Sequence, residues 1–121
     1  MRKENEGIIY AGISGYGTTG PYCNRPGYDV MITAMGGMMS ITGEENGNPV
    51  KIGVALIDLI TGLYAVSTIS SSLYQRNFTG KGKKIELSLI DSQVPLISSF
   101  LIIICIMIII IIIFINNSRR W

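Results

Sequence analysis

The 121-residue sequence contains no histidine, so it lacks the side chain that most often acts as a general base or binds zinc or iron. Its two cysteines, Cys23 and Cys105, are far apart and belong to no Cys-x-x-Cys pair, so they indicate no disulfide framework. The net charge is only +2 and the basic residues are scattered, so no nucleic-acid partner is expected. Residues 1–10 contain no long apolar run, so no signal peptide is expected. The absence of histidine excludes mechanisms that need an imidazole in this sequence. The length of 121 residues is enough for one domain with a modest core.

Polar residues are also absent near the C-terminus. Residues 100–115 read FLIIICIMIIIIIIFI, without a polar side chain, and residues 96–115 carry no charge. That length is about what is needed to cross a hydrocarbon core of roughly 30 Å. Arg119, Arg120 and Trp121 follow, and these residue types suit a membrane interface. We therefore separate residues 1–95 from an Ile-rich apolar tail, 96–121, which is interpreted either as a transmembrane helix or as a non-native segment.

The remaining pattern alternates between strand-like and helix-like segments. A buried strand is expected at residues 7–14, a strand or extended segment at 50–57, and a strand at 85–89. Helices are expected at about 28–37, from Asp58 to about Gly80, and from Asp91 onward. Asp58 is expected to be the N-cap of the long helix, which Arg76 and Gly80 would end. This order predicts an α/β fold with parallel strands.

Gly15, Gly17 and Gly20 in SGYGTTGPY have the Gly-x-Gly-x-x-Gly spacing of a dinucleotide-binding turn. In that fold a helix must start immediately after the turn. Pro26 would break such a helix, and no acidic residue lies about 20 positions further on. Dinucleotide binding is therefore a third hypothesis, behind those described next.

Asp58 follows the apolar stretch VALI, where a charge is costly unless it is used or capped. The simplest interpretation is an N-cap whose carboxylate accepts hydrogen bonds from its own helix. A carboxylate at a helix start is also held ionised by the helix dipole, which suits a nucleophile in acyl transfer. Both interpretations stay open on the residues alone.

Three segments together resemble the class III CoA-transferases, a family that includes formyl-CoA and carnitine-CoA transferases. The segments are SGYGTTGPYCNRPGYDVMITAMGGMMSITG, VKIGVALIDLITGLYA and LYQRNFTGKGKKIELSLIDSQV, within residues 8–94. The resemblance is strongest to the branch that moves CoA from succinyl-CoA to glutarate or hydroxymethylglutarate. It implies a partial Rossmann-like large domain, here followed by an apolar helix.

The resemblance implies that Asp58 is the nucleophile and forms an aspartyl-CoA thioester. By position it also implies that Gly27, Tyr28 and Asp29 line the site of the CoA thioester. The racemase branch has a histidine at the position of Tyr28, so tyrosine favours CoA transfer over racemisation. The alternative for this pair is Tyr28 in the core and Asp29 as the cap of its own helix.

The implied substrates are an acyl-CoA and a carboxylic acid, with CoA as substrate and no other cofactor or metal. Full-length relatives of this branch are implied to be mitochondrial homodimers, although the sequence shows no targeting segment. The parts of the family that contact the CoA nucleotide have no counterpart here, so we expect the isolated chain to be inactive. A non-catalytic, membrane-anchored α/β scaffold is the alternative.

Overall fold

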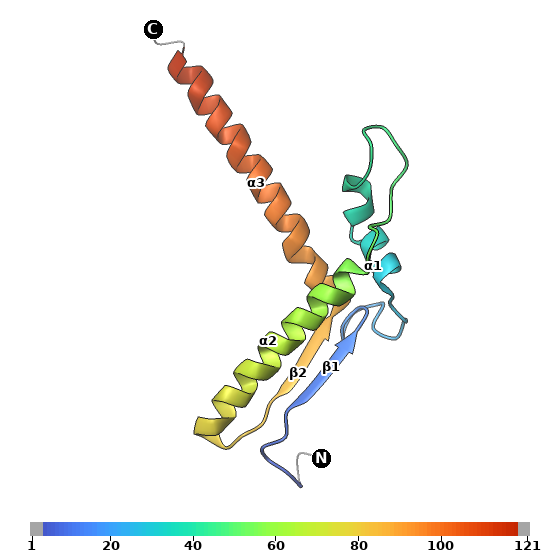
Figure 1. Cartoon of the computed structure of the whole chain (residues 1–121), viewed down its shortest axis with the longest axis vertical. Helices are drawn as coiled ribbons and strands as arrows, with labels where there is room; N and C mark the ends of the chain where they lie inside the picture. Colours follow the sequence, from blue (N-terminus) through green and yellow to red (C-terminus); the bar gives the residue numbers. More distant parts are fainter. Residues whose placement is uncertain (1–3, 119–121) are drawn as a thin grey trace.

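The computed structural model describes residues 4–118 (Figure 1). The elements follow the order β1 (Tyr10–Ser14), α1 (Asp29–Met35), a 3₁₀ helix η1 (Met38–Ile41), α2 (Leu56–Thr79), β2 (Lys84–Ser88) and α3 (Leu89–Ser118). The chain is thus a partial α/β domain, as predicted.

The two strands form a small parallel sheet. Their register runs from Tyr10 opposite Lys84 to Ser14 opposite Ser88. Parallel strands need a long crossover, and here α1, η1 and α2 supply it. The predicted parallel pairing is therefore confirmed.

One strand prediction and one burial prediction were wrong. Residues 50–57 form no strand, because Pro49 and Gly53 disfavour a regular ladder and the backbone already becomes helical at Leu56. The predicted burial of residues 7–14 also fails, since Tyr10 is 52% and Ile13 is 55% exposed. Within the described chain the sheet has only two strands, so β1 is an edge strand with an uncovered face.

The core lies where the three helices meet at one end of the sheet. Ile32 of α1, Met38 of η1, Ile57 of α2 and Leu89 of α3 form one buried cluster. Ile32 and Ile57 have no exposed surface. Burying an aliphatic side chain of this size contributes about 1.5–3 kcal/mol, so this cluster holds the start of α2 against α1.

The opposite end of α2 stops where the sequence predicts. Gly80 has a φ of 67°, in the left-handed region, and its N–H donates to the carbonyl of Arg76 at 2.8 Å. Glycine adopts this conformation without the steric cost of a Cβ. The Arg76 guanidinium then donates to the Gly7 carbonyl at 3.2 Å, which joins the end of α2 to the segment before β1.

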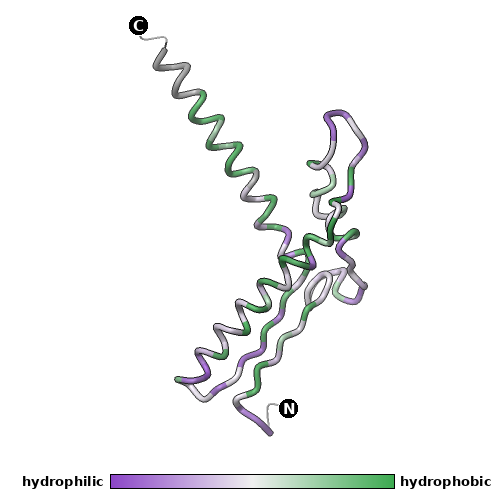
Figure 2. The backbone as a smooth tube through the Cα atoms, in the orientation of Figure 1, coloured by the Kyte–Doolittle hydropathy of each residue, from purple (hydrophilic) through white to green (hydrophobic). Residues whose placement is uncertain are grey.

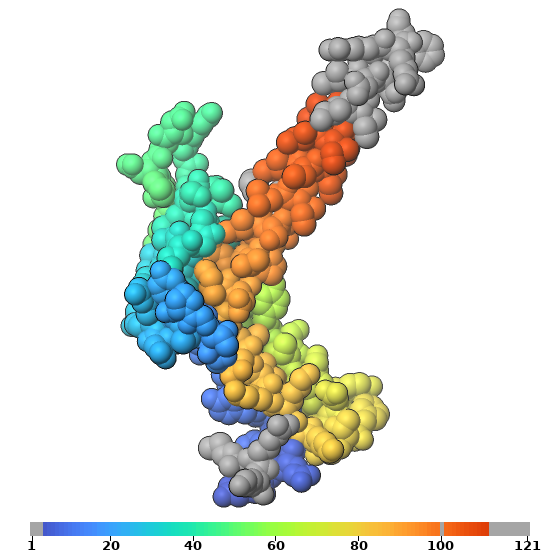
Figure 3. Space-filling model, turned by 180° about the vertical axis from the view of Figure 1, so that it is seen from behind, coloured from blue at the N-terminus to red at the C-terminus, as the bar shows by residue number. Residues whose placement is uncertain are grey.

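Helix α3 runs without a break past residues 95 and 96, although Pro95 lies inside it. Its first turns pack on the core, while the Ile-rich part projects from the body (Figures 1 and 3), and the coloured part of this projection is mostly apolar (Figure 2). Residues 101–111 are all exposed. The predicted apolar helix is therefore confirmed, whereas the boundary at 95/96 stays a prediction.

Two helices of the described chain, α2 and α3, are long and apolar enough to cross a membrane. Helix α2 nevertheless packs on β2 and buries Ile57, Thr61, Ala65 and Ser72. Length and hydropathy alone therefore do not identify a membrane span in this protein.

Candidate active site at the start of helix α2

Asp58 lies in the first turn of α2, but it is not the N-cap. The helix begins at Leu56 and its N-cap is Ala55, which has no side chain able to accept a hydrogen bond. The predicted capping role of Asp58 is therefore wrong. The helix starts two residues before Asp58, after a tight turn in which the Leu56 N–H donates to the Val54 carbonyl at 2.9 Å, and a distant residue supplies the cap.

That distant residue is Asp29, the first residue of α1. Its Oδ2 accepts hydrogen bonds from the N–H of Ile57 at 2.7 Å and from the N–H of Asp58 at 3.2 Å. The first N–H groups of any helix lack partners within the helix, and a carboxylate there also favours the positive end of the helix dipole. Asp29 thus caps α2 rather than its own helix.

The Asp58 carboxylate is left free by this arrangement. Asp58 is exposed, and within residues 4–118 its side chain makes no hydrogen bond or ion pair. The helix dipole favours a negative charge at this position. The site therefore presents an anionic oxygen to an approaching molecule, which is the requirement for attack on a carbonyl carbon.

The loop of residues 15–28 connects β1 to this site through a close backbone contact. An ideal Cβ on Gly27 would lie 2.5 Å from the Cα of Gly15, so neither position has room for a side chain. Gly17 and Gly20 have φ values of 84° and 90°, which glycine adopts readily. The glycines predicted to allow a tight path therefore do so.

The same loop does not form a dinucleotide-binding turn. After Gly20 the backbone makes turns, and the next helix, α1, begins only at Asp29. The pyrophosphate of a dinucleotide requires a helix N-terminus directly at the glycine turn. The described residues therefore contain no helix N-terminus at this turn that could bind the pyrophosphate of a dinucleotide.

The structure places Asp29 against the start of α2, and Tyr28 and Gly27 directly precede it in the chain. Tyr28 is the N-cap residue of α1 and is 64% exposed, so the alternative that put Tyr28 in the core is wrong. Asp29 is half-buried and bonded to the backbone of Asp58. The predicted residues are thus gathered in one region; the partner of Asp29 was missed, because no local pattern encodes a contact between two helices.

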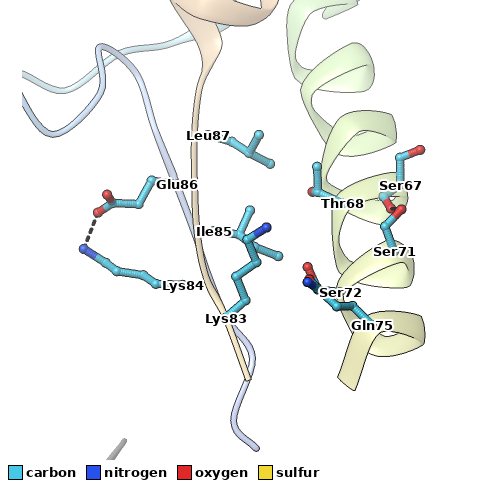
Figure 4. Close-up of a pocket in the computed structure, with 10 residues that line it drawn as sticks. All are labelled: Ser67, Thr68, Ser71, Ser72, Gln75, Lys83, Lys84, Ile85, Glu86 and Leu87. Atoms are coloured by element: carbon cyan, nitrogen blue, oxygen red, sulfur yellow. Dashed lines mark hydrogen bonds and ion pairs between the residues drawn. The ribbon is translucent and has the colours of Figure 1, made fainter. Parts of the chain in front are cut away.

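A groove of about 500 Å³ lies elsewhere, between the second half of α2 and β2 (Figure 4). Ile85 and Leu87 face the helix, whereas Lys84 and Glu86 point away and form an ion pair. Its nearest α2 residue, Ser67, is nine positions beyond Asp58, or roughly 13 Å along a helix. This groove is separate from the candidate site.

Comparisons with known proteins agree with this geometry. The family model described as CoA-transferase family III matches residues 1–105. The human succinyl-CoA:glutarate CoA-transferase is 53% identical over 91 residues, which are 75% of this chain and 21% of that protein. The succinate–glutarate CoA-transferase of Agrobacterium fabrum is 42% identical over 99 residues, which are 82% of this chain and 25% of that protein.

A solved structure supports the same conclusion. The CAIB/BAIF family protein from Brucella suis superposes with a TM-score of 0.72 at 50% identity, covering 75% of this chain and 24% of that one. The chain therefore belongs to CoA-transferase family III. It spans about a fifth of the length of the human relative, at 21%.

Proposed function

We propose that this chain supplies the nucleophile of a CoA-transferase, which moves CoA from an acyl-CoA to a carboxylic acid. The observation that carries the proposal is the exposed Asp58 carboxylate, which has no hydrogen-bond partner in residues 4–118 and sits in the first turn of α2. It lies within the segment matched by the CoA-transferase family model. A carboxylate is a weak nucleophile in water, so the site must also position and desolvate it.

The first half of the reaction loads CoA onto the protein. A carboxylate oxygen of Asp58 attacks the thioester carbonyl carbon of the donor, the C–S bond breaks, and CoA leaves as a thiolate. This forms a mixed anhydride between Asp58 and the donor acyl group. The thiolate then attacks the Asp58 carbonyl carbon, releasing the donor acid as a carboxylate and leaving an aspartyl-CoA thioester.

The second half repeats these steps in reverse order on a different acid. The acceptor carboxylate attacks the Asp58 carbonyl carbon and displaces the CoA thiolate, forming a second mixed anhydride. The thiolate attacks the acceptor carbonyl carbon, which releases the acceptor acyl-CoA and restores the Asp58 carboxylate. The acyl groups stay activated throughout, so the reaction needs no nucleoside triphosphate.

Succinyl-CoA as donor and glutarate as acceptor are the proposed substrates, because the human and mouse relatives are named succinyl-CoA:glutarate CoA-transferase. Tyr28 is exposed beside the site and is proposed, with Gly27 and Asp29, to line the thioester end of CoA. A homodimeric, mitochondrial enzyme is part of the same proposal. Membrane association of residues 96–121 stays a prediction.

The test uses a chimera, because this chain spans about a fifth of the human relative, at 21%. The matched residues of that enzyme are replaced by those of this chain, and CoA transfer from succinyl-CoA to glutarate is measured. We expect transfer to persist, and we expect Asp58→Asn to lower kcat by at least roughly a thousandfold. Mass spectrometry of the quenched reaction should find CoA attached to Asp58.

The matched control is Glu45→Gln, which removes a carboxylate from the exposed loop between η1 and α2. This variant should transfer CoA at the unaltered rate. An Asp58→Asn chimera that turned over as fast as the Glu45→Gln chimera would refute the proposal, as would an adduct on a different residue.

A further inference from the structure

The first backbone N–H groups of α2 have a complete set of acceptors, but no side chain near them in sequence provides one. The Leu56 N–H donates to the Val54 carbonyl two residues back, in a tight turn, and the Leu59 N–H donates to the Ala55 carbonyl at 3.1 Å, as in a regular helix. Residues 53–55 are Gly, Val and Ala, which have no side-chain acceptor. The remaining two N–H groups, those of Ile57 and Asp58, have Asp29 as their only acceptor within the described residues.

Asp29 is held in place by packing on both sides. It opens α1, whose Ile32 is fully buried in the same cluster as Ile57. On its other side, the backbone contact between Gly27 and Gly15 anchors the preceding loop to the end of β1. The carboxylate therefore reaches α2 from the start of a helix that is packed on the core.

We infer that Asp29 is a positioning residue, which sets the start of α2 and thereby orients Asp58. An Asp in the first turn often uses its own carboxylate to cap the backbone. Here one oxygen of Asp29 takes both N–H groups, at 2.7 and 3.2 Å, so the Asp58 carboxylate has no capping task. This inference rests on the proposed function, and it gives Asp29 a role distinct from contact with substrate.

The structure suggests variants that separate the two roles. Asp29→Ala removes the cap and the charge, whereas Asp29→Asn removes the charge but keeps an oxygen acceptor, since Asn caps as well as Asp. Ala55→Ser introduces a local N-cap, whose hydroxyl can reach the same N–H groups two and three positions on. The double variant Asp29→Ala, Ala55→Ser therefore restores the cap without restoring residue 29.

Amide hydrogen exchange of the full chain is the first readout, and it does not depend on activity. Asp29→Ala should speed exchange at Ile57 and Asp58 by roughly 2- to 30-fold, the range expected for losing a cap. Asp29→Asn and the double variant should stay near the unaltered rate. Unchanged exchange in Asp29→Ala would overturn the inference while leaving the role of Asp58 untouched.

CoA transfer by the chimera is the second readout. Asp29→Ala should lower kcat with little change in KM, and both Asp29→Asn and the double variant should recover most of the loss. Equal losses in all three variants would mean that the charge of Asp29 acts on the substrate, which would overturn the positioning role. Failure of the proposed function itself would instead appear as an active Asp58→Asn chimera.

Discussion

Helices α2 and α3 begin in different ways, although an aspartate lies in the first turn of each. At α3 the Ser88 hydroxyl accepts a 3.1 Å hydrogen bond from the Asp91 N–H and donates to the Asp91 carboxylate. The partners are three residues apart. At α2 the acceptor is Asp29, and it lies 28 and 29 residues from its donors.

This difference determines what each aspartate can do. Asp91 is engaged with its own cap, so its carboxylate is not free. Asp58 is relieved of that task by another helix, so its carboxylate faces solvent. The cap of α3 joins residues three apart in sequence, whereas the cap of α2 requires α1 to be packed beside it. The side-chain cap at the candidate active site thus depends on tertiary structure, whereas the side-chain cap of α3 is local. The start of α3 has a tertiary bond only through its backbone, where the Ile90 N–H donates to the Gly15 carbonyl at 3.1 Å.

Among the proposed substitutions, Ile32→Ala should cause the largest loss of stability and the largest difference in amide exchange between the starts of α2 and α3. The side chain has no exposed surface and packs between α1 and α2, so its removal should lower the free energy of unfolding by about 2–5 kcal/mol. Amide exchange should rise at Ile57 and Asp58 more than at Asp91. The control is Val30→Ala on the same helix, which is 46% exposed and should change stability by about 0.5 kcal/mol or less. Equal loosening of both helix starts would show that the start of α3 depends on α1 as strongly as the start of α2 does, and unchanged exchange at Ile57 and Asp58 would show that α2 does not depend on α1.

A smaller effect is expected from Gly27→Ala, which acts on the loop before Asp29. The new Cβ would lie 2.5 Å from the Gly15 Cα, so the two backbones must separate, at a cost of about 1–3 kcal/mol. Urea unfolding gives the loss in stability, and exchange at Ile57 reports whether Asp29 has moved. Gly53→Ala is the control, since an added Cβ there meets nothing within 4 Å. A Gly27→Ala chain as stable as Gly53→Ala would contradict the close contact.

The same contrast explains how much could be predicted from the sequence. The parallel α/β order, the end of α2 at Gly80 and the apolar helix all follow from local patterns and were correct. The start of α3 was expected at Asp91 and lies at Leu89, although the Ser-x-x-Asp spacing marks it. The local pattern from Ser88 to Asp91 is therefore sufficient to predict the start of α3 at Leu89.

The start of α2 could not be predicted in this way. An aspartate before an apolar helical pattern is ordinarily its N-cap, so Asp58 was assigned that role. Which carboxylate caps the helix depends on where α1 lies, and no spacing within residues 50–60 carries that information. The contact between Gly15 and Gly27 was missed for the same reason, since it forms only when the loop closes on itself.

The smallest loss of stability should come from Ser88→Ala, which tests most directly whether the caps of α2 and α3 are independent. It removes the acceptor of the Asp91 N–H and should cost about 0.5–2 kcal/mol, with faster exchange at Asp91. Exchange at Ile57 and Asp58 should not change, because their cap lies on α1. Ser71→Ala is the control, since that exposed hydroxyl bonds to the Ser67 carbonyl of its own helix.

The losses of stability caused by Ser88→Ala and Asp29→Ala should add when the two substitutions are combined, because independent caps contribute independently. A coupling above about 0.5 kcal/mol would mean that the two helix starts form one cooperative unit, with Asp58 sensitive to both caps.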